Sequence, residues 1–237
     1  MRGRTIGMLG DALPEPVQAV LAGVSISSYR VMRRSTTFTY DGKTYPYFCH
    51  RYNLAWRNER AVEVPIARDL LDAYKEQRVL EVGNVMSHYF EVEHDVLDKY
   101  ESGENIINGD VVEFEPDHPY DLVLSVSTLE HVGWDETPRE PGKAAIALNR
   151  MTTFLAPGGL LVATIPIGYN RELDGVLEGG SLPFTELRAL KRTSRWNAWQ
   201  EVAPASCRAA SYDSASVTAR CLYVGYLEKP HGHLSDH

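Results

Sequence analysis

The chain has 237 residues, of which 43% are hydrophobic, and its formal net charge is −8 at pH 7. This composition predicts a folded chain with a packed core and argues against intrinsic disorder. The acidic balance lacks the positive charge with which proteins hold nucleic-acid phosphates, so we expect no nucleic-acid partner. No segment approaches the about 18 apolar residues that a membrane-spanning helix needs, so we expect a cytoplasmic protein without membrane contact.

The three cysteines, Cys49, Cys207 and Cys221, lie far apart and lack the spacing of metal ligands. We interpret them as reduced, mostly buried thiols, as is usual in cytosolic proteins. Nearer the N-terminus, two prolines precede residues 17–21, where a short helix without chemistry is expected.

Residues 36–56 are crowded with aromatic side chains around the turn signal Asp41-Gly42. The pattern predicts a β-hairpin whose rings pack on the core. The alternative is an aromatic lid over a ligand, because Tyr and Trp offer flat, half-polar contact surfaces. The next segment, 54–74, has a helical pattern that we expect Pro65 to divide into two helices. Its acids Glu59 and Glu63 lie one helical turn apart, which predicts an ion-paired surface.

From residue 78 onward, short apolar runs alternate with helical patterns. We expect strands over 78–83, 95–98, 122–126, 160–165, 199–203 and 221–227, and helices over 142–155 and 181–192. This alternation predicts an α/β fold with a Rossmann-like, doubly wound, mostly parallel seven-stranded sheet. We expect one domain: residues 1–75 as an aromatic-rich N-terminal extension, 76–230 as the α/β part and 231–237 as a tail.

Two residues with acid–base chemistry follow the most apolar of these strands. The run 122–126 is a predicted buried strand, and Glu130 and His131 come just past its end. Ligands of open α/β sheets lie outside the carboxyl ends of the strands. His131 is the candidate general base because histidine titrates near neutral pH, with Glu130 to orient it. The alternatives are a histidine that caps a helix start and a glutamate that faces solvent.

The turn after the first sheet strand carries Gly83, which lets the backbone approach a bound nucleoside. The pattern Gly-x-Gly-x-x-Gly is absent, because Val85 stands where the second glycine would be. A dinucleotide pyrophosphate therefore lacks its usual cradle, which favours a ligand without phosphates at this turn.

Four ordered segments, 79–83, 108–110, 120–131 and 155–164, together resemble the motifs of class I S-adenosylmethionine-dependent methyltransferases. The match covers roughly residues 75–168, and the missing second glycine departs from it. The resemblance implies that S-adenosylmethionine is the cofactor. It implies that Glu81, Gly83 and Asn84 surround the methionine part. It further implies contacts of Asp98 with the ribose, of Asp110 with the adenine amino group, and of Ser125 and Ser127 near the sulfonium.

A closer similarity links residues 47–60 and 127–136 to methyltransferases of sugar and polysaccharide biosynthesis, including the mycobacterial 1-O-methyltransferases of methylmannose oligosaccharides. It implies O-methylation of a small polar acceptor, a sugar or oligosaccharide such as a methylated mannoside. The residues that would contact the acceptor are Tyr47, His50, Tyr52, Trp56 and Trp134. It also implies a Mg²⁺ ion, which the carboxylates of Asp135 and Glu136 would suit. The alternative for these acids is a solvated loop.

Two other functions stay open at this point. One is a nicotinamide-dependent oxidoreductase on a similar sheet, which Val85 in the glycine turn disfavours. The other is a non-catalytic binding protein that has kept the fold. The oligomeric state is also open, a homodimer included.

Overall fold

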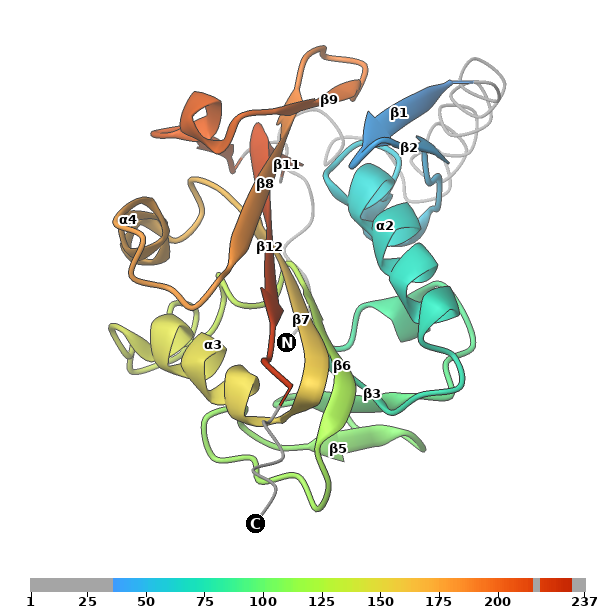
Figure 1. The fold of residues 1–237 in the computed structure, drawn as a ribbon. Coiled ribbons are helices and arrows are strands. Elements are labelled where there is room, and N and C mark those ends of the chain that lie inside the picture. Colours follow the sequence, from blue (N-terminus) through green and yellow to red (C-terminus); the bar gives the residue numbers. More distant parts are fainter. Residues whose placement is uncertain (1–35, 215–217, 232–237) are drawn as a thin grey trace, which may run out of the picture.

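The structure is a computed structural model that describes residues 36–214 and 218–231. Its centre is an eight-stranded sheet with the order β5-β4-β3-β6-β7-β12-β8-β9 (Figure 1). In this order the strands are β5 (Ile106–Asn108), β4 (Asp95–Asp98), β3 (Val79–Val82), β6 (Tyr120–Val126), β7 (Leu155–Pro166), β12 (Cys221–Glu228), β8 (Glu186–Arg192) and β9 (Trp199–Val202).

The strands β5 to β7 pair in parallel, β12 is antiparallel to both β7 and β8, and β9 is antiparallel to β8. The predicted Rossmann-like, mostly parallel sheet is confirmed, with eight strands in place of seven. From β3 the chain moves outward to β4 and β5, and it then returns to the other side of β3 as β6. The strand order therefore reverses between β3 and β6, which is where open α/β sheets bind ligands.

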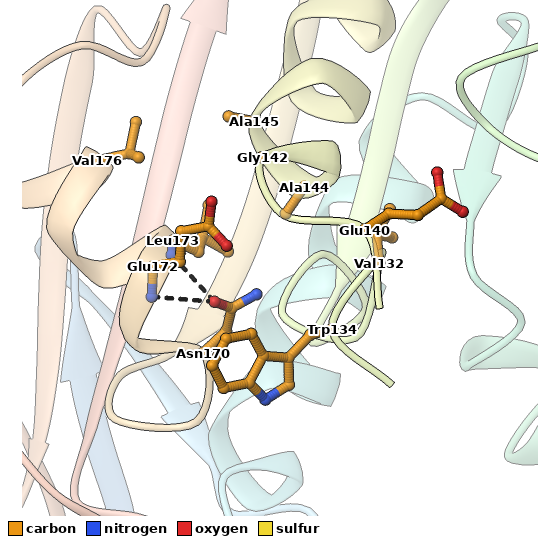
Figure 2. Close-up of a pocket in the computed structure, with 10 residues that line it drawn as sticks. All are labelled: Val132, Trp134, Glu140, Gly142, Ala144, Ala145, Asn170, Glu172, Leu173 and Val176. Atoms are coloured by element: carbon orange, nitrogen blue, oxygen red, sulfur yellow. Dashed lines mark hydrogen bonds between the residues drawn. The ribbon is translucent and has the colours of Figure 1, made fainter. Parts of the chain in front are cut away.

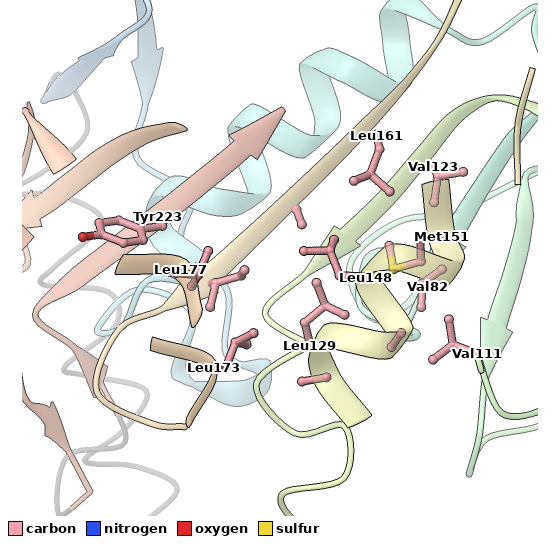
Figure 3. Packing of buried hydrophobic residues seen from close by; sticks show 14 of the residues in the cluster. Val82, Val111, Val123, Leu129, Leu148, Met151, Leu161, Leu173, Leu177 and Tyr223 are labelled. Atoms are coloured by element: carbon pink, nitrogen blue, oxygen red, sulfur yellow. The ribbon is translucent and has the colours of Figure 1, made fainter. Parts of the chain in front are cut away.

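Helices cover both faces of the sheet (Figure 1). The helices α3 (Lys143–Thr153) and α4 (Arg171–Glu178) lie on one side, and α2 (Arg60–Ala73) lies on the other. Successive side chains of β6 point to opposite faces of the sheet. Leu122 and Leu124 belong to the core cluster that includes residues of α2. Val123 packs with Leu148 and other residues of the α3 side (Figure 3). Because the strand is buried on both faces, its sequence is apolar without a break.

The predicted hairpin is confirmed as β1 (Thr37–Tyr40) and β2 (Lys43–Pro46). Both turn residues have positive φ, 50° for Asp41 and 69° for Gly42, as a two-residue type I′ turn requires. Phe38 and Tyr45 are buried and their rings stack with centroids 5.5 Å apart. These rings therefore pack on the core, as the simpler of the two interpretations expected.

Pro65 does not divide the helical segment, because α2 is a single helix with this proline inside. Proline lacks the N–H that would bond to the carbonyl four residues earlier, here that of Ala61. The Phe48 N–H donates to this carbonyl instead, at 2.9 Å. The hydrogen bond from outside the helix satisfies the group that proline leaves open.

The predicted helix over 181–192 is wrong, since residues 186–192 form β8, and the helix of this region is the earlier α4. Glu, Leu, Lys and Arg favour helices locally. Pairing with β12 on one side and β9 on the other overrides this preference. Asn170 caps α4 by accepting hydrogen bonds from the N–H groups of Glu172 and Leu173.

Cys207 and Cys221 form a disulfide with a Cα–Cα distance of 5.6 Å, so the prediction of reduced thiols is wrong for this pair. The short elements are the 3₁₀ turns η1 (Tyr52–Leu54), η2 (Met86–His88) and η3 (Pro204–Cys207) and the pair β10 (Tyr212–Asp213) and β11 (Thr218–Ala219). Within residues 36–214 and 218–231, no helix has the length and apolarity to cross a membrane. The helix expected over 17–21 lies outside the described residues.

Candidate active site

A cavity of about 330 Å³ lies at the carboxyl ends of β3, β4 and β6, beside the point where the strand order reverses. Four segments line it: 82–85, 97–100, 109–111, and the loop residues Thr128, His131, Val132, Asp135 and Glu136. Of the predicted cofactor residues, the structure brings four together here: Gly83, Asn84, Asp98 and Asp110.

Gly83 has φ of +88°, a conformation that residues with a side chain rarely adopt. A Cβ at this position would lie 2.1 Å from Oγ1 of Thr128, so the space permits only glycine. The Gly83 N–H donates to the carbonyl of Leu97 at 2.8 Å, which ties the turn to β4. Backbone at this turn therefore forms part of the cavity wall, as predicted.

Glu81 does not reach the cavity, contrary to the contact with the methionine part that the resemblance implied. Its carboxylate is fully buried, and Oε1 accepts hydrogen bonds from the N–H groups of Val85 and Met86 at 2.9 and 2.8 Å. The other oxygen lies 3.0 Å from Nε2 of His94. Glu81 therefore fixes the shape of the turn and leaves contact with a ligand to its neighbours.

Asp98 ends β4 and lines the cavity, as predicted. Its Oδ2 accepts a hydrogen bond from the N–H of Asn84 at 2.9 Å. Its Oδ1 accepts from the N–H groups of Tyr100 and Glu101, both at 2.8 Å. The carboxylate thus holds the glycine turn and the turn after β4 in fixed positions on the cavity wall.

Two lysines alternate with two carboxylates at one side of the cavity. The ammonium of Lys99 lies 2.9 Å from Asp110 and 2.7 Å from Glu136, and that of Lys143 lies 2.9 and 2.8 Å from the same two groups. Burial raises the pKa of both carboxyls, but the ammonium groups outweigh it and lower each pKa to about 2. We call these four residues the ion quartet. The prediction missed its lysines, although Lys99 directly follows Asp98.

The predicted Mg²⁺ site at Asp135 and Glu136 finds no support. Glu136 is paired with two ammonium groups, and Asp135 belongs to a separate group around His131. Among the residues that the structure describes, no three His, Cys, Asp or Glu side chains form a group that could hold a metal ion.

His131 lies at the rim of the cavity with its side chain about half exposed. Its Nδ1 lies 2.6 Å from Oδ2 of Asp135, and the hydroxyl of Tyr169 donates to the same oxygen at 2.7 Å. Burial lowers the pKa of His131, but the carboxylates of Asp135 and Glu130 outweigh it, so the pKa is raised. Tyr169 was not predicted; it comes three residues after β7, whose end lies beside that of β6.

Glu130 lies on the inner side of His131, with its Oε1 3.5 Å from Nε2 of the imidazole. It is 2% exposed, so it does not face solvent. Its Oε2 accepts no hydrogen bond from any described residue. Burial raises the pKa of this carboxyl to about 7.

The two predicted serines do not reach the cavity. Ser125 is fully buried and donates to the carbonyl of Val82 at 3.1 Å. Ser127 donates to the carboxylate of Glu63 at 2.5 Å. Both hydroxyls are thus used inside the sheet end, which corrects their assignment to the cofactor.

The acids of α2 are buried, so the expected ion-paired surface is wrong. Glu63 is fully buried and pairs with Arg60, Oε2 to Nη1, at 2.7 Å. Arg60 also donates to the carbonyls of Val126 and Ser127, at 3.4 and 3.5 Å. Burial and the nearby Glu63 raise the pKa of Glu59. The charged residues of the first turn of α2 therefore lie at the carboxyl end of β6, where the loop that carries Glu130 and His131 begins.

The predicted acceptor residues of the N-terminal part do not line the cavity. The hydroxyl of Tyr47 accepts from the N–H of Trp199 at 2.8 Å. His50 and Tyr52 belong to an aromatic cluster around Tyr89, and Tyr52 also stacks on His88 with centroids 4.4 Å apart. Trp56 contacts the guanidinium of Arg57.

Trp134 lies at a second and much smaller pocket, of about 10 Å³, between the starts of α3 and α4 (Figure 2). The guanidinium of Arg139 lies 3.8 Å from the centre of its ring. Trp134 is thus separate from the larger cavity, and the structure gives no support to its role in acceptor binding.

No family model matches the chain, and no curated protein does. Solved structures similar to it include the N-methyltransferase NodS from Bradyrhizobium japonicum WM9, with 16% identity, 73% of this chain and 97% of that chain covered, and a TM-score of 0.46. A SAM-dependent methyltransferase from Thermotoga maritima has 16% identity, coverage of 74% and 93%, and a TM-score of 0.46.

A third similar structure is 1,6-didemethyltoxoflavin-N1-methyltransferase from Burkholderia thailandensis, with 18% identity, coverage of 95% and 93%, and a TM-score of 0.43. All three are described as methyltransferases. At these identities the similarity concerns the fold alone.

Proposed function

We propose that this protein transfers a methyl group from S-adenosylmethionine to a hydroxyl group of a small polar acceptor, a sugar or oligosaccharide. A methylated mannoside is the acceptor that the sequence similarity implies. One observation carries the proposal: an imidazole held by a carboxylate lies at the rim of a cavity formed by a glycine turn and strand-end acids.

The cavity fits this cofactor in size and charge. Its volume lies in the range of small-molecule sites, roughly 300–1,000 Å³. The charges of the ion quartet balance one another, and the other charged groups that line the cavity are the carboxylates of Asp98 and Asp135 and the imidazole of His131. An acidic wall favours a ligand with a positive charge, such as a sulfonium, and disfavours the pyrophosphate of a dinucleotide.

The residues present suggest how the cofactor would be held. The turn at Gly83 and Asn84 would take the amino-acid part, Asp98 the ribose hydroxyls, and the segment from Gly109 to Val111 the adenine. When bound, S-adenosylmethionine supplies an electrophilic methyl group, and its transfer is an in-line displacement that depends mainly on positioning.

In the reaction, the residues of this protein would prepare the acceptor oxygen for its attack on the methyl group. A hydroxyl is a weak nucleophile near neutral pH, and Nε2 of His131 would accept its proton as the oxygen attacks. The Asp135 carboxylate at Nδ1 holds the proton on that nitrogen, which leaves Nε2 free to act as the base. General bases of this kind contribute about 10²–10⁴-fold to the rate.

Thermal unfolding with S-adenosylhomocysteine and, separately, with NADH tests the proposal, since a ligand of the folded state raises the melting temperature. We expect a rise with S-adenosylhomocysteine and none with NADH. Asp98→Asn should lose much of the rise, whereas Asp72→Asn, on the exposed side of α2, should keep it. A rise with NADH alone would favour the oxidoreductase.

A further inference from the structure

The buried carboxylate of Glu130 lacks a donor on one of its oxygens. Its Oε2 accepts no hydrogen bond within the described part of the chain, and only 2% of the residue is exposed. Buried polar atoms in folded proteins nearly always have a partner, so an exception requires an explanation. The other oxygen, Oε1, lies 3.5 Å from Nε2 of His131, the proposed general base. The unpaired oxygen therefore belongs to a carboxylate beside the proposed reaction site.

The described charges around Glu130 do not neutralise it. The nearest guanidinium, that of Arg60, is already paired with Glu63 at 2.7 Å. The imidazole of His131 is shared with Asp135. A third acid of the interior, Glu59, accepts a hydrogen bond from the N–H of Ala219 and has a raised pKa from burial and from Glu63. The interior beside His131 is therefore short of positive charge.

Two tyrosine rings lie next to His131, with Tyr169 against the imidazole and Tyr212 against Tyr169. The centroids of Tyr169 and Tyr212 are 5.1 Å apart with an interplanar angle of 87°. Tyr169 also lies 4.6 Å from the imidazole of His131. Burial raises the pKa of both tyrosines, and nearby carboxylates raise it further: Asp135 and then Glu130 at Tyr169, and Glu59 and then Glu130 at Tyr212. Ring faces together with a carboxylate attract cations, ammonium groups above all.

We infer that the acceptor carries a protonated amine, which binds the free oxygen of Glu130 beside Tyr169 and Tyr212 and brings the neighbouring hydroxyl to His131. This inference rests on the proposed methyl transfer to a hydroxyl. It narrows the substrate class to amino alcohols, amino sugars among them, and it replaces the neutral mannoside that the sequence similarity implies. A neutral hydroxyl in the place of the amine would leave the buried carboxylate without a counter-charge, and an anionic group would be repelled.

A small cation and its neutral counterpart test this subsite directly. The protein is saturated with S-adenosylhomocysteine at pH 7.5, and its melting temperature is measured with 100 mM ethanolammonium chloride, with sodium chloride at equal ionic strength, and with ethylene glycol. We expect only ethanolammonium to raise the melting temperature, by about 2–4 °C, as a weak ligand of the folded state would.

Two matched variants complete the test. Glu130→Gln should lose the response to ethanolammonium while the response to S-adenosylhomocysteine stays. Glu113→Gln, at an exposed position, should keep both responses. A wild-type protein without the response, or an equal response in Glu130→Gln, would overturn the amine subsite. Absence of any response to S-adenosylhomocysteine would instead overturn the proposed function.

Discussion

Two groups of charged residues flank His131, and the same residue types behave differently in each. In the ion quartet, two ammonium groups face two carboxylates, and the pKa of both carboxyls falls to about 2. In the interior group of Glu59, Glu63 and Glu130, three acids share little positive charge beyond Arg60. There, burial raises the pKa of Glu130 to about 7. The quartet balances two ammonium groups with two carboxylates, whereas the interior group sets three acids against one guanidinium.

The largest effect is expected at the residue between the two groups. His131→Ala should lower kcat by about 10²–10⁴-fold, because the acceptor hydroxyl loses its base. The affinity for S-adenosylhomocysteine, measured by calorimetric titration, should stay within a few-fold, since most of the cavity wall is unchanged. Unchanged turnover in this variant would show that another group accepts the proton.

Loss of a lysine from the ion quartet should lower the free energy of unfolding. Lys143→Ala leaves two nearly buried carboxylates with one ammonium group and should lower the free energy of unfolding by about 3 kcal/mol. Lys99→Ala is the matched control, because Lys99 is more exposed and its loss should cost less. Urea unfolding of both variants measures the difference, and equal losses would contradict the importance of burial here.

Removal of the Glu130 carboxylate from the interior group should instead raise the free energy of unfolding. The pKa of Glu130 is raised in the folded protein, from 4.5 to about 7, so the folded state binds the extra proton. The resulting stability is present below pH 4.5 and is lost as the pH rises through 7. Glu130→Gln should therefore be more stable than wild type at pH 8, by about 2–3 kcal/mol, with little difference at pH 5.

Urea unfolding at pH 5 and pH 8 measures this change. A variant that is less stable than wild type at both values would show that the carboxylate is compensated in the folded protein after all.

The smallest effect concerns the pH profile. Asp135 and Glu130 raise the pKa of His131. The imidazole therefore loses its proton, and can act as the base, only at a higher pH than an ordinary histidine. Asp135→Asn should move the acidic limb of the rate profile to lower pH, and it should also lower the maximal rate. A limb that stays in place would mean that the observed titration belongs to another group.

The sheet was predictable from sequence because its strands are buried on both faces and read as short apolar runs. Gly83 directly follows β3, Asp98 is the last residue of β4, and His131 comes five residues after the end of β6. Their place at the carboxyl edge of the sheet was therefore predictable as well. Sequence could not tell that the charges at the start of α2 are buried, since alternating signs are equally typical of a surface. Sequence also could not show that Lys143 and Tyr169 belong to the site. Their segments lie beside it only because of the order of the strands in the sheet, which the sequence does not specify. The strand β8 was missed because pairing outweighs its helical composition.

A crystal structure with S-adenosylhomocysteine tests the central claim most directly, because the sulfur marks the place of the transferred methyl group. We predict that the nucleoside occupies the cavity between Gly83, Asp98 and Asp110, with its sulfur toward His131 and Glu130. A nucleoside bound elsewhere, or a sulfur directed away from His131, would contradict the account.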